Sequence, residues 1–511
     1  MKKLIQQRQK VFGGMVAMIA VLVIVTLALP AKQDARRVDV QATSVAVTET
    51  SQEPLTPADR ALYRAIFAAQ EKGDFASADQ HLSEVNSQLL LGHVLAQRYL
   101  RPGYRSEAAE LAAWAGNFAD HPAATEITRL AIKRGAKIDP VVTAATSTSP
   151  LRGAGYIDHL GAKSMPQGWY HGLTLWRAGN YAAAARQFET VASKNDLNPW
   201  HRSAAYFWAY RSYNRIKSDR AATMLEFAAE YKTTFYGMLA NETLGNSRGW
   251  MASAPYVPSA LRREPAVLRA QALASIGREV DAEVELRHLF PRLSRHERKA
   301  MITLASEFNL PNLQVRLSQM KDLNPSEALF ASYPMPSAIA KAQNKVDPAV
   351  IFAISRQESG FRPHVASHAG AVGMMQMLPS TARHVARSLS ETQLASVNMD
   401  NLGNLHLTNA ETNVRLGAAY IEMLMKQPMV NQSLIHALAA YNAGPGSVAG
   451  WQRTAKNIHD PLLYIESIPF GETRNYVLQV LAHYWVYQHL MGESAQSLDA
   501  LAAGHWPMYQ G

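Results

Sequence analysis

The sequence predicts an all-α protein. From residue 57 onward the chain is a succession of Ala- and Leu-rich segments with polar interruptions, and no stretch sustains the Val/Ile/Thr alternation of strands. One phrase recurs, in which an apolar helix is followed by glycine, a polar residue, an aromatic residue and an Ala-rich helix. It occurs at 72–76, at 178–182 and, more loosely, at 276–282. The unequal spacing predicts an irregular superhelix of stacked helix pairs. An ordinary helical bundle is the alternative.

Composition limits the classes of protein. A chain of 511 residues that is 48% hydrophobic and 18% charged can bury the cores of roughly three domains. The absence of cysteine excludes disulfides, thiolate metal sites, a cysteine nucleophile and a cysteine-linked lipid anchor. The net charge is +10, but no tract is rich in Lys and Arg. We therefore expect no nucleic-acid partner.

The N-terminus has the pattern of an export segment. Four of the first ten residues are Lys or Arg, and the apolar stretch Val11–Ala31 follows without a charge. This stretch is long enough to span a bilayer, so an uncleaved anchor and a cleaved signal peptide both remain open. In either case the rest of the chain is expected outside the cytoplasm. Residues 32–56 mix charge, Ser/Thr and Val without a helical period, and we interpret them as a flexible tether.

Proline clusters divide the helical region. Three prolines lie between 255 and 265, and two more lie at 334 and 336. They predict a superhelical domain at 57–254, a helical linker domain at 255–334 and a further helical domain at 335–490, followed by a tail at 491–511. Four tryptophans in the first of these domains are expected to pack in its core, with a role as sugar platforms as the alternative; they are Trp169, Trp176, Trp200 and Trp208.

A short helix after residue 346 carries the most informative carboxylate. Asp347 and Pro348 suit the N-cap and first position of a helix, and Gly360 and Pro363 are stop signals. Glu358 therefore falls in the last turn, where the helix dipole disfavours a negative charge by ~0.3–1 kcal/mol. The dipole and partial burial both favour the protonated carboxyl, which is the form that a general acid needs. A surface ion pair of Glu358 with Arg356 or Arg362 is the alternative.

Three further segments follow in order. They are SHAGAVGMMQMLPSTA at 367–382, AYNAGPG at 440–446 and ESIPFGETRNY at 466–476. Together with the helix that ends in Glu358, they resemble the catalytic domain of the soluble lytic transglycosylases, which has a goose-type lysozyme fold. The resemblance is close over roughly 335–490. It is looser upstream, where 57–254 is similar to that family's U-shaped superhelical domain and 256–332 to its linker domain. The upstream helical region is shorter than in the large members.

The resemblance implies one catalytic residue and a set of substrate-binding residues. Glu358 is the acid/base, Ser359 and Gln376 orient it or the sugar, and Tyr476 hydrogen-bonds its carboxyl. Met374 and Met375 line the glycan groove. Tyr441 and Asn442 contact the sugar at the scissile bond. Glu466 lies deeper, as a structural or subsite residue. The family usually has leucine where this chain has Met374, and it usually has Leu-Met where this chain has Met377-Leu378.

The resemblance also implies the reaction. The family cleaves the β-1,4 bond between N-acetylmuramic acid and N-acetylglucosamine in peptidoglycan and closes a 1,6-anhydro ring. A single carboxyl agrees with this, since no other Asp or Glu lies within ten residues of Glu358. We expect peptidoglycan strands as the partner and the periplasm as the location, with inner-membrane association through residues 11–31 if the segment is uncleaved. No cofactor is expected. No metal is expected either, because no third ligand lies near His364 and His368 in the sequence.

Two other functions are weighed against this one. A helical-repeat scaffold could bind glycan without cleaving it, but a binder has no need of an acid at a helix end. A hydrolytic muramidase would use water and a second carboxylate, for which Glu466 and Glu472 are the candidates.

Overall fold

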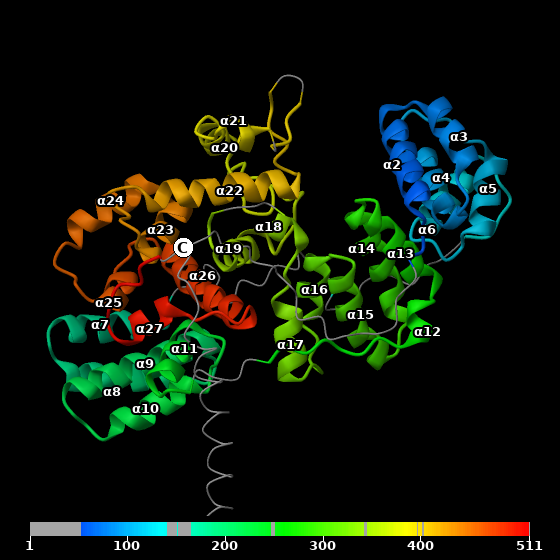
Figure 1. Ribbon diagram of the computed structural model, residues 1–511. Helices are drawn as coiled ribbons and strands as arrows, with labels where there is room; N and C mark the ends of the chain where they lie inside the picture. Colours follow the sequence, from blue (N-terminus) through cyan, green and yellow to red (C-terminus); the bar gives the residue numbers. More distant parts are fainter. Residues whose placement is uncertain are drawn as a thin grey trace, which may run out of the picture. The chain divides into compact units, whose positions relative to one another are not determined.

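The structure is a computed structural model that describes residues 53–140, 151, 165–246, 251–341, 345–395, 397–400 and 403–509 (Figure 1). In this part of the chain all regular elements are helices, and β structure is limited to isolated bridges such as Ala366 with Val372. The all-α prediction is confirmed. None of the described helices combines the length and apolarity that a membrane span needs. The predicted export segment at 1–31, and the tether up to residue 52, lie outside the described residues.

The helices before residue 250 fall into two groups. The first group comprises α2 (Pro57–Lys72), α3 (Phe75–Glu84), the 3₁₀ helix η1 (Gln88–Leu90), α4 (Leu91–Tyr99), α5 (Ala108–Asn117) and α6 (Ala124–Lys133). The second comprises α7 (Trp169–Arg177), α8 (Tyr181–Ala192), α9 (Pro199–Arg215), α10 (Arg220–Ala229) and α11 (Phe235–Thr243).

The remaining helices follow the two proline clusters. Between the clusters lie α12 (Ser259–Arg262), α13 (Pro265–Ser275), α14 (Glu279–Leu289), η3 (Phe290–Arg292), α15 (Arg295–Glu307), α16 (Pro311–Leu317) and α17 (Pro325–Ser332). The last region holds α18 (Ser337–Lys341), α19 (Pro348–Ser359), α20 (Pro379–Ala386), α21 (Glu391–Leu394), α22 (Ala410–Met425), α23 (Leu434–Ala443), α24 (Pro445–Thr454), α25 (Pro461–Glu466), α26 (Gly471–Leu490) and α27 (Gln496–Ala502).

The recurring phrase forms helix pairs as predicted. Its glycines, Gly73, Gly179 and Gly277, end α2, α7 and α13 with φ of 81°, 74° and 82°. These values lie in the left-handed region that glycine adopts without the strain of a Cβ atom. In each case the next helix starts two residues later and packs against the one before it.

The hydrophobic cores cross two of the predicted domain limits. One core joins α2, α3 and α4 to helices α12–α17, and another joins α7–α11 to the helices after residue 333. Within the second core the ring of Phe235 stacks on Trp485 of α26, with centroids 5.1 Å apart. The four tryptophans named above are buried in this same core, which confirms that they pack.

The last helices complete the second core. Every residue of α26 from Thr473 to Gln488 is buried, so this helix runs through the centre of its region. The segment predicted as a tail contributes α27, whose Leu498 and Leu501 are buried. The chain then returns to α23, where Leu434 N donates to Pro507 O at 2.9 Å.

Candidate functional site

The helix α19 begins and ends as the sequence predicted. Asp347 caps it, with Oδ1 accepting from Ala349 N at 2.8 Å, and Pro348 is its first residue. Gly360 ends it with φ of 59°. The position of Glu358 in the last turn therefore follows from local signals alone. Tyr484 of α26 donates to Asp347 Oδ2 at 2.8 Å and ties the start of α19 to the central helix.

Glu358 is half-buried as a residue, and the pKa of its carboxyl is strongly perturbed. Burial raises its pKa to about 8; a hydrogen bond from Tyr476 acts in the opposite direction, and the negative charge of Glu472 raises it further. A carboxyl with this pKa is mostly protonated at pH 7. Tyr476 and Glu472 both belong to the first two turns of α26. The central helix thus supplies the groups that tune the acid.

The two arginines near Glu358 have other partners. Arg356 is buried, and its guanidinium donates to Ser332 O at 2.8 Å and to His483 Nε2 at 2.9 Å. Arg362 donates to Ser359 O at 2.7 Å. Both guanidiniums are held against the protein by these contacts. The alternative in which Glu358 is a surface ion-pair partner is therefore not favoured.

Ser359 joins the end of α19 to the following loop. Its side chain is fully buried, and its hydroxyl donates to Met374 O at 2.6 Å. The same oxygen accepts from Arg362 N at 3.0 Å. Because both contacts are to backbone, Ser359 fixes the loop beside Glu358.

The loop from 365 to 377 is held by side-chain amides. Gln376, which has φ of 49°, donates to Val365 O at 3.2 Å and to Gly373 O at 2.9 Å. Met374 and Met375 are buried rather than open to solvent. Met374 lines a cavity. The sulfur of Met375 packs closely against Gly417, where a larger residue would place its Cβ only 2.4 Å from that sulfur.

Asn413 of α22 is a site residue that the sequence analysis missed. Its buried amide accepts from Met375 N at 2.7 Å and donates to Val372 O at 2.9 Å and Leu407 O at 3.0 Å. Gly373 leaves room for it, since a Cβ there would lie 2.2 Å from Asn413 Nδ2. An asparagine in the middle of an amphipathic helix gives no local signal of this role. Only the distant loop makes it recognisable.

Tyr441 and Asn442 lie at the end of α23, next to the same loop. The Tyr441 hydroxyl donates to Met375 O at 2.8 Å, and the charge of Glu358 adds to the burial that raises the pKa of Tyr441 well above its ordinary value. Asn442 Oδ1 accepts from Thr473 Oγ1 of α26 at 2.7 Å. Glu358, Tyr441, Asn442 and Tyr476 are thus gathered by α19, α23 and α26.

Glu466 occupies a different place. Its buried carboxyl accepts from the Tyr236 hydroxyl of α11 at 2.6 Å, and its other oxygen lies 3.9 Å from Arg474 Nε. Arg474 also donates to the Tyr170 hydroxyl of α7 at 3.1 Å. These contacts link α25 and α26 to helices far upstream. Glu472, in contrast, is exposed and is the carboxylate whose charge acts on Glu358.

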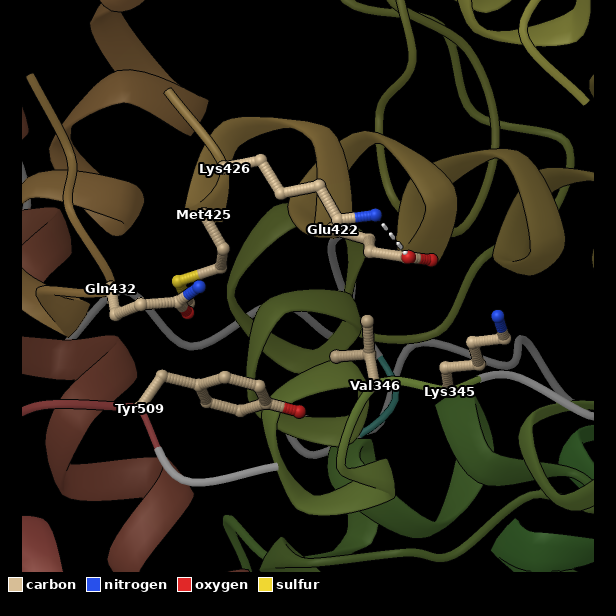
Figure 2. Close-up of a pocket in the computed structure, with 7 residues that line it drawn as sticks. All are labelled: Lys345, Val346, Glu422, Met425, Lys426, Gln432 and Tyr509. Carbon is tan, nitrogen blue, oxygen red and sulfur yellow. Dashed lines mark hydrogen bonds and ion pairs between the residues drawn. The ribbon is translucent and has the colours of Figure 1, made fainter. Parts of the chain in front are cut away.

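Two cavities lie at opposite ends of α19. One, of about 780 Å³, adjoins the residues that follow Glu358 and is lined by Phe361, His364 and Met374 and by Glu283 and Arg287 of α14. The other, of about 340 Å³, lies at the start of the helix around Val346 and Tyr509 (Figure 2). Because Glu358 is at the far end of α19, the second cavity is not part of its surroundings.

His364 and His368 are both exposed. Among the described residues, one group of side chains lies close enough together to hold a metal ion. Neither His364 nor His368 belongs to it.

Comparison with known proteins agrees with this geometry. Residues 335–462 match the family model of the transglycosylase SLT domain. The chain carries an SLT domain. The match includes α19, the 365–377 loop, α22 and α23, and it confirms the resemblance seen in the sequence. A second model, the soluble lytic transglycosylase helical domain, matches residues 467–496, which contain α26.

Two relatives are similar to parts of this chain. Soluble lytic murein transglycosylase of Salmonella typhimurium is 32% identical over 286 residues, which are 54% of this chain and 42% of the relative. The Escherichia coli K12 protein of the same name is 38% identical over 152 residues, 30% of this chain and 22% of the relative. The chain thus spans less than half the length of these relatives.

A solved structure extends the likeness to the fold. The 70-kDa soluble lytic transglycosylase of E. coli superposes with a TM-score of 0.55 at 17% identity, over 88% of this chain and 99% of that one. This confirms the predicted fold class, an irregular α-superhelix followed by a lysozyme-like helical domain.

Proposed function

We propose that this protein is a peptidoglycan lytic transglycosylase. It cleaves the β-1,4 bond between N-acetylmuramic acid and N-acetylglucosamine without water and leaves a 1,6-anhydro-muramic acid end. The observation that carries the proposal is the carboxyl of Glu358, whose pKa burial raises to about 8 beside Tyr476. It lies within the SLT-domain match, and the relatives named above are murein transglycosylases.

The mechanism uses Glu358 twice. The protonated carboxyl gives its proton to the glycosidic oxygen, so that N-acetylglucosamine leaves as the alcohol. The N-acetyl group of the muramic acid stabilises the positive charge at C1. The Glu358 carboxylate then takes the proton of the C6 hydroxyl, and that oxygen bonds to C1. The acid is regenerated, no water enters, and the intramolecular attack gains from proximity.

The neighbouring side chains suit this chemistry. Asn442 Oδ1 is already engaged by Thr473, so its NH₂ group is the part left to donate to a carbonyl such as that of the N-acetyl group. Tyr441 uses its hydroxyl within the protein and presents its ring to the sugar. Ser359 and Gln376 hold the loop of Met374 and Met375 beside the acid. Glu466 supports the site from deeper in the protein.

The substrate and the N-terminus predict where the protein acts. Peptidoglycan strands lie outside the cytoplasm, and the basic and then apolar start of the chain directs the rest there. We place the enzyme in the periplasm, with residues 11–31 as an inner-membrane anchor when they are not cleaved.

A hydrolytic muramidase is the second candidate, and one observation favours it. Glu472 lies close enough for its charge to raise the pKa of Glu358. Two neighbouring carboxyls are the usual arrangement of a glycosidase that uses water. Glu466 is a poorer second carboxylate, because its oxygens face Tyr236 and Arg474.

Digestion of purified peptidoglycan distinguishes these functions. The released muropeptides are weighed by mass spectrometry for the wild type, Glu358→Gln and Glu472→Gln. The proposal predicts wild-type products one water lighter than hydrolysis products, none from Glu358→Gln and the same anhydro products from Glu472→Gln. Full-mass reducing ends that disappear in Glu472→Gln would establish the muramidase. Binding without release by the wild type would favour a glycan-binding scaffold.

A further inference from the structure

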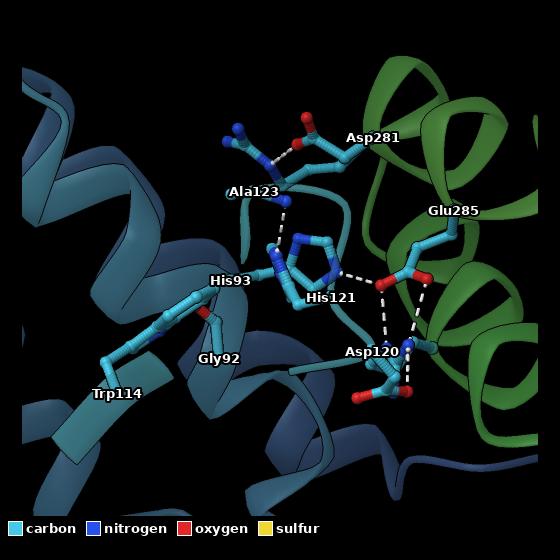
Figure 3. Close-up of polar contacts among 10 residues, drawn as sticks. Gly92, His93, Trp114, Asp120, His121, Ala123, Asp281 and Glu285 are labelled. Carbon is cyan, nitrogen blue, oxygen red and sulfur yellow. Dashed lines mark hydrogen bonds and ion pairs between the residues drawn. The ribbon is translucent and has the colours of Figure 1, made fainter. Parts of the chain in front are cut away.

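A second group of ionisable side chains lies away from Glu358, where α4 and the turn before α6 pack against α14 (Figure 3). His93 Nε2 lies 2.7 Å from Glu285 Oε1, and the rings of His93 and His121 are 4.1 Å apart between centroids. One ligand-type atom from each of the three residues lies within 4.8 Å of the others. The exposed fractions of His93, His121 and Glu285 are 9%, 4% and 0%.

One atom of this group has no partner among the described residues. His121 Nδ1 accepts from Ala123 N at 3.0 Å, while His121 Nε2 is buried and makes no hydrogen bond within the part of the chain that the structure describes. Buried polar atoms are nearly always satisfied, so a nitrogen of this kind indicates a missing ligand.

The charges around the group favour a cation. Arg269 donates to Glu285 Oε1 at 2.7 Å and Oε2 at 3.1 Å and pairs with Asp120 at 2.9 Å. Two carboxylates against one guanidinium leave a net negative charge beside the two imidazole rings.

The group is also accessible. A cavity of about 320 Å³ is lined by both histidines and by the acidic side chains of Glu126 and Asp281. It offers an entry path for a cation and room for water. Two histidines and one glutamate with an open position are a ligand set that zinc adopts in proteins.

We propose that His93, His121 and Glu285 bind one divalent transition-metal ion, for which zinc is the best match, with water completing the coordination from the cavity. The ion would join α4 to α14, whose ligands are 192 residues apart in the chain. Coordination through His121 Nε2 moves the ring proton to Nδ1, so the contact with Ala123 N must open. The site is independent of the proposed enzymatic function, and neither depends on the other.

Calorimetry on the full chain tests the site. The protein, purified without a histidine tag and stripped with a chelator, is titrated with zinc chloride. We expect one site per chain and a zinc-dependent rise in Tm. His121→Gln should weaken binding by about a hundredfold or more, because loss of a ligand costs more than the roughly 10–100-fold lost with an outer-shell partner. His296→Gln, at an exposed histidine, is the matched control and should bind like the wild type.

A second measurement tests the site even if His121→Gln does not fold. Cobalt(II) added to the stripped wild type should give the intense visible absorption of a four- or five-coordinate site, and the Ala123 amide resonance should shift when its acceptor is lost. The absence of stoichiometric zinc binding by the wild type would overturn the proposal. So would zinc binding that His121→Gln leaves unchanged, or a cobalt spectrum identical to that of the hydrated ion.

Discussion

Three effects set the ionisation of Glu358. Burial raises its pKa most, the Tyr476 hydrogen bond lowers it and the charge of Glu472 raises it. The sequence predicted a raised pKa, because the helix dipole and partial burial both disfavour an anion at the C-terminal end of an apolar helix. It could not predict the effect of Glu472, which lies more than a hundred residues later and approaches Glu358 only through the packing of α26.

The two neighbours should shift the pH profile in opposite directions. Activity needs the protonated acid, so kcat/KM should fall as the pH rises through the pKa of Glu358. Glu472→Gln removes a neighbouring charge and should move this alkaline limb to lower pH. Tyr476→Phe removes a bond that stabilises the carboxylate and should move it to higher pH. Glu391→Gln, at an exposed position on α21, is the control. Limbs that stay together in all four proteins would contradict the account.

Glu358 should also cost stability. Its pKa is raised in the folded state from an ordinary value of 4.5, so the folded protein binds more protons and becomes less stable as the pH rises from about 4.5 to about 8. Glu358→Gln should therefore be more stable than the wild type by roughly 3 kcal/mol at pH 7. Below pH 4.5 the difference should vanish. Urea unfolding at several pH values measures this, and a difference that is constant with pH would argue against a raised pKa.

At the scale of elements, the site depends on a helix and a loop that differ in how well the sequence predicts them. The helix α19 follows from its cap, its apolar face and its glycine stop, all within residues 347–360. The 365–377 loop has no such local rule. Its geometry comes from Ser359, Gln376 and Asn413, and the last of these lies in α22. Side-chain contacts between distant segments leave no periodic pattern in a single sequence.

Asn413 should be required for the shape of the loop. Asn413→Ala leaves Met375 N and Leu407 O without their partner, each at a cost of ~1–3 kcal/mol when it stays buried, while Val372 O keeps its bond from Met377 N. We expect a lower free energy of unfolding and a lower kcat. Asn398→Ala, at an amide outside these contacts, provides a comparison by thermal unfolding and peptidoglycan digestion. Equal stability and activity in Asn413→Ala and the wild type would contradict this role.

At the scale of the whole molecule, the described helices share cores across the predicted domain limits. Proline clusters in the sequence mark where helices stop, and the fold class follows from the absence of strand patterns. Which helices then pack together is a matter of contacts such as Phe235 with Trp485 and Tyr236 with Glu466, hundreds of residues apart. Through them α11 supports α25 and α26, and α26 carries Tyr476.

Phe235 should therefore stabilise more than its own helix. Phe235→Ala removes a buried ring at the stack with Trp485 and should cost about 3–5 kcal/mol. Peptidoglycan cleavage should be lost at the same lowered temperature as the helical circular dichroism. An exposed aromatic, Tyr256, gives the control variant Tyr256→Ala. Activity that survives the melting of the upstream helices would show that the two regions are stabilised separately.

The proposed mechanism requires that the fold keep Glu358 protonated near neutral pH. A carbon-13 NMR titration of the glutamate carboxyls, with Glu358→Gln to assign the resonance, tests it most directly. The resonance missing from the variant should titrate with a pKa of about 8 in the wild type. A pKa near the ordinary value of 4.5 would contradict it, because the carboxyl would then be ionised at pH 7 and could not serve as the acid.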